Sequence, residues 1–202
     1  MLKLYHTAQS RSTRPRWLLE EIGAPYDLVP VDMSKQEHKT PQYLEIHPHG
    51  VVPALVDGDL ALMESGAICA YLADKFPAAR LAPAVGTPER GRYYQWMFYT
   101  MATLEPPLVQ VFMNTVILPE AQRSAAQVEE GRKKFGEVAE VVTNALAGKP
   151  FLLGEQFSAA DVMVGSTIVW AQMLGLLGEW PMLAEYAQRL SARPAFQRAF
   201  GD

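Results

Sequence analysis

A chain of 202 residues is long for one small domain and comfortable for two. Its residues are 49% apolar and 20% charged, which is typical of a globular protein with a sizeable core. A net charge of −4 and an isoelectric point of about 5.6 give no electrostatic reason to expect binding to nucleic acid or to an anionic membrane. The single cysteine, Cys69, excludes an internal disulfide and a cysteine-based zinc site, so a cytoplasmic location is the default expectation.

The first half of the chain opens with a predicted strand followed by a predicted helix. A short apolar run at residues 2–5 predicts the strand, and an apolar helix face follows it and ends at Gly23. Because proline fits only the first turn of a helix, Pro15 places the start of that helix near Ser12 or Thr13. A loop of polar residues therefore separates the strand from the helix.

A second strand is expected at residues 26–31, and a hairpin follows an irregular polar stretch. Asp57-Gly58 is a strong turn signal between two apolar runs. Beyond the return strand, apolar residues repeat at a four-residue spacing and predict a helix that begins at Ser65. The order β-α-β and then β-β-α is the thioredoxin-like arrangement, in which the two halves share one mixed sheet.

Two positions beside the hairpin suit a small peptide-like ligand. Pro53 at the start of a strand leaves the backbone groups of Val52 without an obligatory sheet partner. Ser65 at a helix start lies near amide donors and the positive end of the helix dipole, which favours a carboxylate. Both positions offer mainly backbone groups to the ligand.

The second half of the chain predicts helices alone. Three prolines and a glycine fall within residues 77–88, which makes this stretch the best candidate for a linker. A helix is expected at residues 89–104, until Pro106-Pro107 breaks or kinks it. A spacing typical of a capping box, Ser158 with Asp161, predicts the start of a buried helix. We therefore expect a first domain at residues 1–78, a linker at 79–88 and an all-helical domain at 89–202.

The Val-Pro-Ala-Leu segment at Val52, the short hairpin and Glu64-Ser65 before a helix together resemble the glutathione-binding half of cytosolic glutathione S-transferases. The second half resembles the all-helical domain of the same enzymes, so the resemblance covers nearly the whole chain. It implies a cis Pro53, a backbone pairing between Val52 and the cysteinyl part of glutathione, and glutathione as co-substrate. It also implies a homodimer, with the helix after Ser65 and the helix of residues 93–104 at the interface.

The resemblance also implies how the thiol of glutathione is activated. Counted back from Arg14-Pro15, Ser10 stands where bacterial theta- and delta-like transferases keep a catalytic serine. A hydroxyl donor and a helix amino end both favour the thiolate, which is the nucleophile. A loop serine that bonds its own backbone is the ordinary alternative. Ser12 is a rival for the role, although a helix-cap role suits it better, and Arg11 replaces the cysteine of beta-like transferases but could itself hold the thiolate.

Further contacts with glutathione are expected at three side chains. The resemblance implies that Ser65 binds the γ-glutamyl end and that Glu64 accepts from its ammonium group. His38 matches a histidine that contacts the glycine carboxylate in theta-like relatives, although a lone histidine on a polar loop is often only solvated. Val51 replaces the lysine or glutamine that is common two places before the proline, and His47 replaces the common asparagine.

Other candidate residues carry weaker expectations. Tyr99, within an aromatic run expected mostly in the core and at the subunit contact, is the candidate for the electrophile pocket. Cys69 is expected to be a small buried residue. The four histidines share no spacing with carboxylates or cysteine that would predict a metal site.

The function expected from these residues is glutathione transfer to a small electrophile. One alternative is a glutathione-dependent disulfide reductase or peroxidase, which needs no enzyme cysteine. A non-catalytic regulator or scaffold on the same fold is the other alternative, and Ser10, Glu64 and Ser65 argue against it because a scaffold needs none of them.

Overall fold

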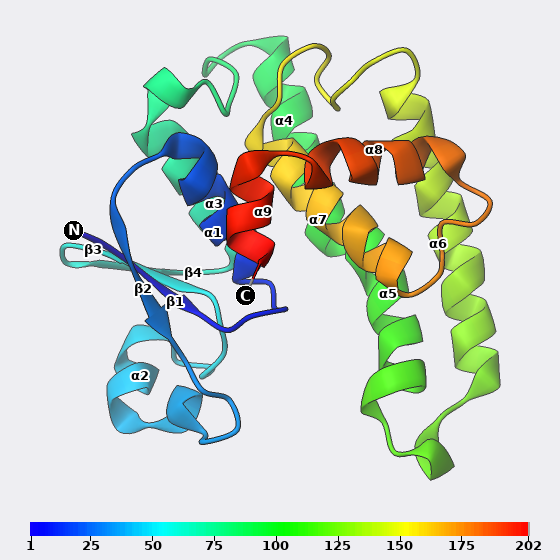
Figure 1. Cartoon of the computed structure of the whole chain (residues 1–202), viewed down its shortest axis with the longest axis horizontal. Coiled ribbons are helices and arrows are strands. Elements are labelled where there is room, and N and C mark those ends of the chain that lie inside the picture. The colour runs from blue at the N-terminus through cyan, green and yellow to red at the C-terminus, as the bar shows by residue number, and fades with distance from the viewer. Residues whose placement is uncertain (202) are drawn as a thin grey trace. The chain divides into compact units, whose positions relative to one another are not determined.

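The computed structural model describes residues 1–201 and forms two compact units (Figure 1). The first unit contains residues 1–82 together with the segment that begins at Ser191, and the second contains Pro83–Leu190. This grouping differs from the expected division, which left all residues after the linker in the helical domain. The reason lies in the packing of the last helix.

A mixed four-stranded sheet forms the centre of the first unit (Figure 1). Its strands are β1 (Leu2–His6), β2 (Tyr26–Pro30), β3 (Ala54–Asp57) and β4 (Leu60–Met63), in the order β2-β1-β3-β4. β1 runs parallel to β2 and antiparallel to β3, and β3 runs antiparallel to β4. This is the strand order expected of a β-α-β and a β-β-α half.

Two helices cover one face of this sheet and a third lies on the other (Figure 1). α1 (Thr13–Ile22) and α3 (Ser65–Lys75) pack against each other, while α2 (Pro41–Ile46) lies on the opposite face. The core between sheet and helices is fully buried and apolar, with Leu4, Trp17, Leu18, Ile68 and Leu72 at its centre. α1 ends at Gly23 in the left-handed conformation (φ +71°), as the sequence predicts.

The last helix, α9 (Pro194–Phe200), belongs to the first unit because it packs on α1. The rings of Trp17 and Phe196 meet edge to face at 4.9 Å. Arg193 pairs with Glu21 through two hydrogen bonds of 2.6 and 2.8 Å. Apolar and ionic contacts therefore hold α9 against α1, although the two helices lie far apart in the sequence.

The second unit contains only helices. They are α4 (Pro88–Tyr99), α5 (Glu105–Phe112), α6 (Ala125–Leu146), α7 (Ala159–Met173) and α8 (Pro181–Ser191). A wide π-helical turn, Thr100–Leu104, joins α4 to α5 without a break. It places Pro106 and Pro107 in the first turn of α5, where a missing N–H costs little, so the prolines do not end the helical run.

The predicted capping residues start the buried helix α7. The carboxylate of Asp161 accepts from the backbone N–H and the hydroxyl of Ser158, both at 2.9 Å. It also accepts from the backbone N–H of Leu152 and the hydroxyl of Tyr186, each at 2.9 Å. A fully buried carboxylate therefore ties the start of α7 to the preceding loop and to α8.

Candidate active site

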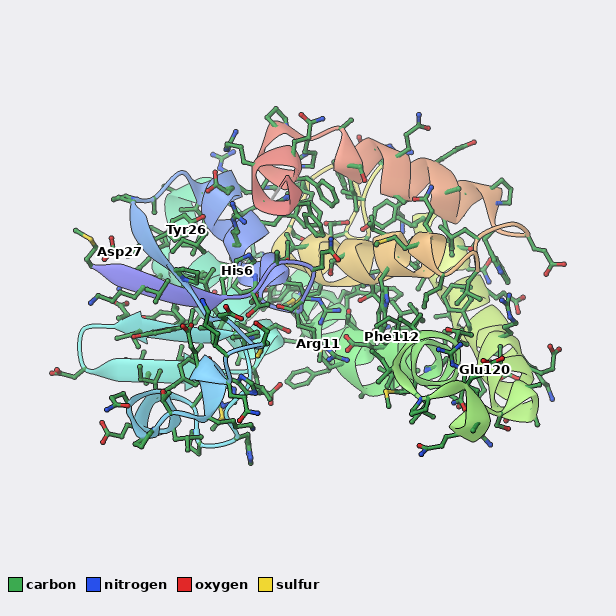
Figure 2. The ribbon with its side chains drawn as sticks, turned by 60° about the horizontal axis from the view of Figure 1, so that its bottom comes forward. His6, Arg11, Tyr26, Asp27, Phe112 and Glu120 are labelled. Atoms are coloured by element: carbon green, nitrogen blue, oxygen red, sulfur yellow. The ribbon has the colours of Figure 1, made fainter. Side chains whose placement is uncertain are left out.

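The loop between β1 and α1 carries Ser10. Gln9 has a φ of +55°, in the left-handed region that non-glycine residues rarely adopt, so the backbone turns sharply just before Ser10. The Ser10 side chain is half-buried, its hydroxyl donates to the carbonyl of Thr7 at 2.7 Å, and its oxygen lies 2.7 Å from the oxygen of Ser12. In Figure 2, His6 marks the end of β1 and Arg11 marks the loop that follows it.

The helix-cap role predicted for Ser12 is wrong. Its backbone is already helical (φ −70°, ψ −15°), and no helix N–H donates to its side chain. The hydroxyl is fully buried and instead lies 2.8 Å from Nδ1 of His6, accepts from the N–H of Thr7 at 3.1 Å and lies 3.0 Å from the carbonyl of Thr7. Ser12 therefore holds the loop closed from inside.

Sequence reasoning missed His6, although its signal was available. The side chains of a strand alternate between the two faces, so His6 shares the face of the buried Leu2 and Leu4. Its exposed fraction is 5%, and its Nε2 lies 3.4 Å from Nη1 of Arg16. A polar group at the end of an apolar strand face is thus placed directly beneath the Ser10 loop.

Ser65 and Glu64 stand at the start of α3, as expected. Ser65 is 2% exposed, while Glu64 is exposed and has a φ of +71°. The buried Arg14 donates from Nη1 to the Ser65 hydroxyl oxygen at 3.3 Å and so ties the amino ends of α1 and α3 together. Arg14 was missed as well; its position four residues before Leu18, on the apolar face of α1, was the signal.

The loop before β3 presents Val52 and a cis peptide bond to Pro53. The phenol of the buried Tyr43 donates to the carbonyl of Val51 at 2.6 Å and fixes this loop from below. Gly50 has a φ of +56°, and a Cβ on it would lie 2.4 Å from the carbonyl oxygen of His38. Only glycine allows this close approach of the His38 loop to the Val52 loop.

His47 is buried in the same loop, with an exposed fraction of 3%. Its ring stacks on Tyr43 at 6.4 Å, and its Nδ1 has no hydrogen-bond partner. Burial, followed by the charge of His49, lowers the pKa of His47 below its usual range. The imidazole is therefore held in its neutral form.

Burial raises the pKa values of two further candidate side chains, Cys69 and Tyr99. Cys69 is fully buried, and burial raises the pKa of its thiol to about 12, so it is no nucleophile. Tyr99, the candidate for the electrophile pocket, lies in the second unit at the end of α4 and is half-buried, which raises the pKa of its phenol. Its ring meets that of Trp96 edge to face, with 5.3 Å between the centroids.

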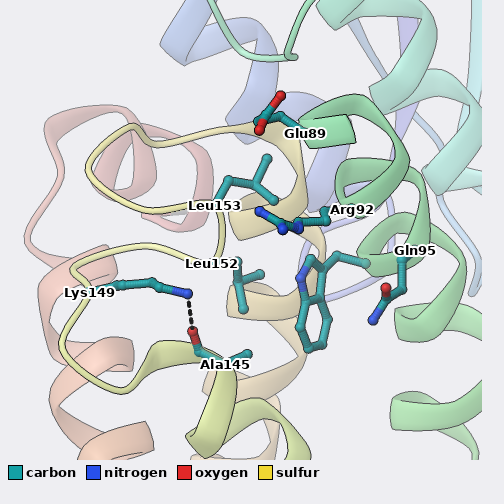
Figure 3. Close-up of a pocket in the computed structure, with 8 residues that line it drawn as sticks. Glu89, Arg92, Gln95, Ala145, Lys149, Leu152 and Leu153 are labelled. Atoms are coloured by element: carbon teal, nitrogen blue, oxygen red, sulfur yellow. Dashed lines mark hydrogen bonds between the residues drawn. The ribbon is translucent and has the colours of Figure 1, made fainter. Parts of the chain in front are cut away.

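A pocket of about 320 Å³ lies within the helical unit (Figure 3). Its lining combines charged and apolar side chains, and no residue expected to bind glutathione or the electrophile is among them: Glu89, Arg92, Gln95, Trp96, Ala145, Lys149, Leu152 and Leu153. Over residues 1–201, no three or more histidine, cysteine, aspartate or glutamate side chains group as a metal site would require. Within the same described part, no helix has the length and apolar character needed to cross a membrane.

Comparison with known proteins identifies the family. The model described as glutathione S-transferase, N-terminal domain, matches residues 1–74, and the corresponding C-terminal domain model matches residues 125–189. A curated relative, a probable glutathione S-transferase GSTF2 of Oryza sativa subsp. japonica, is 34% identical over 98% of this chain and 94% of its own length. The chain belongs to the glutathione S-transferase family.

Solved transferase structures share the fold throughout. A glutathione transferase from Methylococcus capsulatus is 29% identical with a TM-score of 0.88 and covers 100% of this chain and 98% of its own. A family member from Pseudomonas fluorescens with two glutathione bound is 27% identical with a TM-score of 0.88, over 98% of this chain and 92% of its own.

These likenesses confirm the predicted fold of this transferase, a thioredoxin-like first half followed by an all-helical half. The bacterial theta- and delta-like subclass that the position of Ser10 suggested is not confirmed, because similar curated relatives include the plant enzymes of Oryza sativa, Zea mays and Arabidopsis thaliana. The family assignment therefore stands on the whole chain, and the role of each site residue remains a prediction.

The neutral state of His47 predicts how the stability of this transferase depends on pH. A histidine whose pKa is lowered by folding binds a proton more readily in the unfolded chain, so its stabilising contribution is lost as the pH falls below about 6.5. Between pH 6.5 and 5, urea denaturation should show His47→Asn losing stability less steeply than the wild type, by up to about 1.4 kcal/mol per pH unit.

The exposed His49 supplies a control for this experiment. His49→Asn removes only the weaker, electrostatic cause of the shift and should change the slope less than His47→Asn does. Equal slopes for the wild type and His47→Asn would show that His47 takes up its proton as freely in the folded protein as in the unfolded chain.

Proposed function

We propose that this transferase conjugates glutathione to a small electrophile, with Ser10 as the catalytic residue that stabilises the thiolate. One observation carries the assignment: the half-buried hydroxyl of Ser10 stands just before the amino end of α1, while the neighbouring hydroxyl of Ser12 is fully buried. Of the two serines, only Ser10 therefore has surface to offer a ligand.

The chemistry needs a group of this kind. A free thiol has a pKa of about 8.5, so most of it is protonated at neutral pH. A hydroxyl donor and the positive end of a helix both lower that value by favouring the anion. The thiolate then attacks an electrophilic carbon, with Tyr99 proposed in the pocket that holds the electrophile.

The start of α3 and the Val52 loop would bind the rest of the tripeptide. Because Arg14 fills one acceptor position of the Ser65 hydroxyl, the proton of that hydroxyl can point to a carboxylate of the γ-glutamyl end. The exposed carboxylate of Glu64 suits the ammonium group, and the backbone of Val52, next to Pro53, suits the cysteinyl amide. His38 is proposed for the glycine carboxylate.

The strained backbone of Glu64 supports this location. A non-glycine residue at a φ of +71° costs about 1–3 kcal/mol and persists where the surroundings fix it, often at a ligand site. No structural observation favours a disulfide reductase or peroxidase over conjugation, and an enzyme cysteine could not assist either reaction, since Cys69 is fully buried.

Ser10→Ala tests the catalytic assignment. Loss of a hydrogen bond to an ion costs about 1.5–3 kcal/mol, so the acidic limb of the pH profile of kcat/KM should move up by roughly one to two units. The KM for glutathione should change little, because the substitution leaves the tripeptide contacts in place. An aryl halide as electrophile reports conjugation directly.

Ser34→Ala, at an exposed serine of the first unit, is the matched control and should leave the profile unchanged. An unmoved profile in Ser10→Ala together with a shifted one in Arg11→Ala would transfer the role to Arg11. If no variant moves the profile, the backbone amides of the loop hold the thiolate and the assignment of Ser10 is wrong.

Ser65→Ala tests the binding assignment. Its bonds go to the far end of the tripeptide and are the same in ground and transition states, so the KM for glutathione should rise by roughly ten- to hundredfold at an unchanged kcat. Ser65→Thr, which keeps the hydroxyl, should recover part of the affinity. A fall in kcat at constant KM would contradict the assignment.

We further propose a cytoplasmic homodimer, with α3 and α4 contributing to the interface. Phe98 and Tyr94 on α4 are 72% and 41% exposed, and large exposed aromatic residues are enriched at subunit contacts. Sedimentation velocity at micromolar concentration should show a dimer, and Phe98→Asp should shift it towards the monomer. Val85→Asp is the control: Val85 is 78% exposed but lies outside α4, so this substitution should leave the dimer unchanged. A monomeric wild type would refute the proposal.

A further inference from the structure

Four side chains of the first unit form a continuous line of polar contacts from the core to the site. Nη1 of Arg16 lies 3.4 Å from Nε2 of His6, Nδ1 of His6 lies 2.8 Å from the Ser12 oxygen, and the Ser12 oxygen lies 2.7 Å from the Ser10 oxygen. The first three residues are buried, with exposed fractions of 8%, 5% and 0%, and only Ser10 reaches the surface.

The chemistry of arginine sets the direction of the protons along this line. A guanidinium group can only donate, so Nε2 of His6 must be the acceptor. A neutral imidazole carries one proton, which is then on Nδ1 and is donated to Ser12. A proton on Nε2 would point at the donors of the Arg16 guanidinium and break this contact, so Nε2 carries none.

Ser12 can therefore act only as a donor towards Ser10. A hydroxyl oxygen has two acceptor positions, and those of Ser12 are filled by Nδ1–H of His6 and by the N–H of Thr7. Two hydroxyl oxygens 2.7 Å apart need a proton between them, and Ser12 is the residue that supplies it. The carbonyl of Thr7 at 3.0 Å is the longer alternative for that proton.

When the hydrogen bonds of Ser10 are counted in the same way, only its hydroxyl proton is left for a ligand. Its oxygen accepts from the hydroxyl of Ser12 at 2.7 Å and from the backbone N–H of Ser12 at 3.2 Å. Both acceptor positions are filled, and the remaining proton goes to the carbonyl of Thr7 until a ligand replaces it. Ser10 can thus donate to a thiolate but cannot take the proton from the thiol.

We propose that His6 and Ser12 are positioning residues that make Ser10 a dedicated hydrogen-bond donor to the thiolate of glutathione. Neither residue touches the substrate; they act by occupying the acceptor positions of Ser10 and by polarising its hydroxyl. The inference rests on the proposed role of Ser10 and extends it to two buried residues. The proton of the thiol leaves to solvent, because Ser10 cannot accept it.

The test is a set of titrations of enzyme-bound glutathione, in which the ultraviolet absorbance of the thiolate is followed against pH. Ser12→Ala and His6→Leu should each raise the pKa of the bound thiol by roughly half a unit, a part of the shift expected for Ser10→Ala. His6→Asn, whose amide can donate from a place close to that of Nδ1, should return the pKa close to the wild-type value.

The Ser10→Ala background separates positioning from general damage to the site. In that background Ser12→Ala and His6→Leu should have no further effect on the pKa of the thiol, because the group that they orient is gone. Thermal unfolding of every variant records its stability, and the affinity for glutathione should stay close to that of the wild type. If His6→Leu does not fold, Ser12→Ala and His6→Asn decide the question.

Three outcomes overturn the proposed positioning role of His6 and Ser12. Wild-type pKa values of the bound thiol in both Ser12→Ala and His6→Leu, alongside a shift in Ser10→Ala, would leave the role of Ser10 intact and reject the positioning role. Full additivity with Ser10→Ala would show that Ser12 or His6 acts on the thiolate independently. A silent Ser10→Ala would reject the proposed role of Ser10, and with it the positioning role of Ser12 and His6, while the family assignment would stand.

Discussion

Burial of the Ser12 hydroxyl between β1 and α1 is the constraint on which the chemistry of the first unit depends. A buried hydroxyl without partners would destabilise the fold by about 1–3 kcal/mol, so the loop from Thr7 to Ser12 closes around it. The N–H of Thr7, the ring of His6 and the hydroxyl of Ser10 all meet its oxygen. Ser10 is thereby held at the rim of the loop, just before a helix amino end.

Backbone conformations that are costly elsewhere shape the rest of the glutathione side. Gln9 and Glu64 each adopt a left-handed φ immediately before Ser10 and Ser65, the two serines with proposed roles. Gly50 lets the His38 and Val52 loops approach more closely than any side chain would permit. Packing of the surrounding sheet and helices must stabilise these conformations, so the shape of the proposed site depends on that packing.

Much of this architecture could be predicted from the sequence because it depends on local signals. Pro15 and Gly23 bracket α1, Asp57-Gly58 marks the hairpin, and Ser158 with Asp161 starts α7. The missed features depend on contacts between distant residues. α9 packs on α1, and no local sequence pattern predicts this contact between distant parts of the chain. The partner of Ser12 is a histidine on another element rather than a helix N–H. A π-helical turn before Pro106-Pro107 likewise has no sequence signature comparable to a cap.

The most direct test of the account is a crystal structure of the protein with glutathione bound. The sulfur should lie within hydrogen-bond distance of the Ser10 hydroxyl, with Ser12 still buried against His6 and out of contact with the ligand. A γ-glutamyl carboxylate should lie at the start of α3, beside Ser65. A sulfur that lies against Arg11 or against backbone amides alone, with the Ser10 hydroxyl still bonded to Thr7, would contradict the central claim.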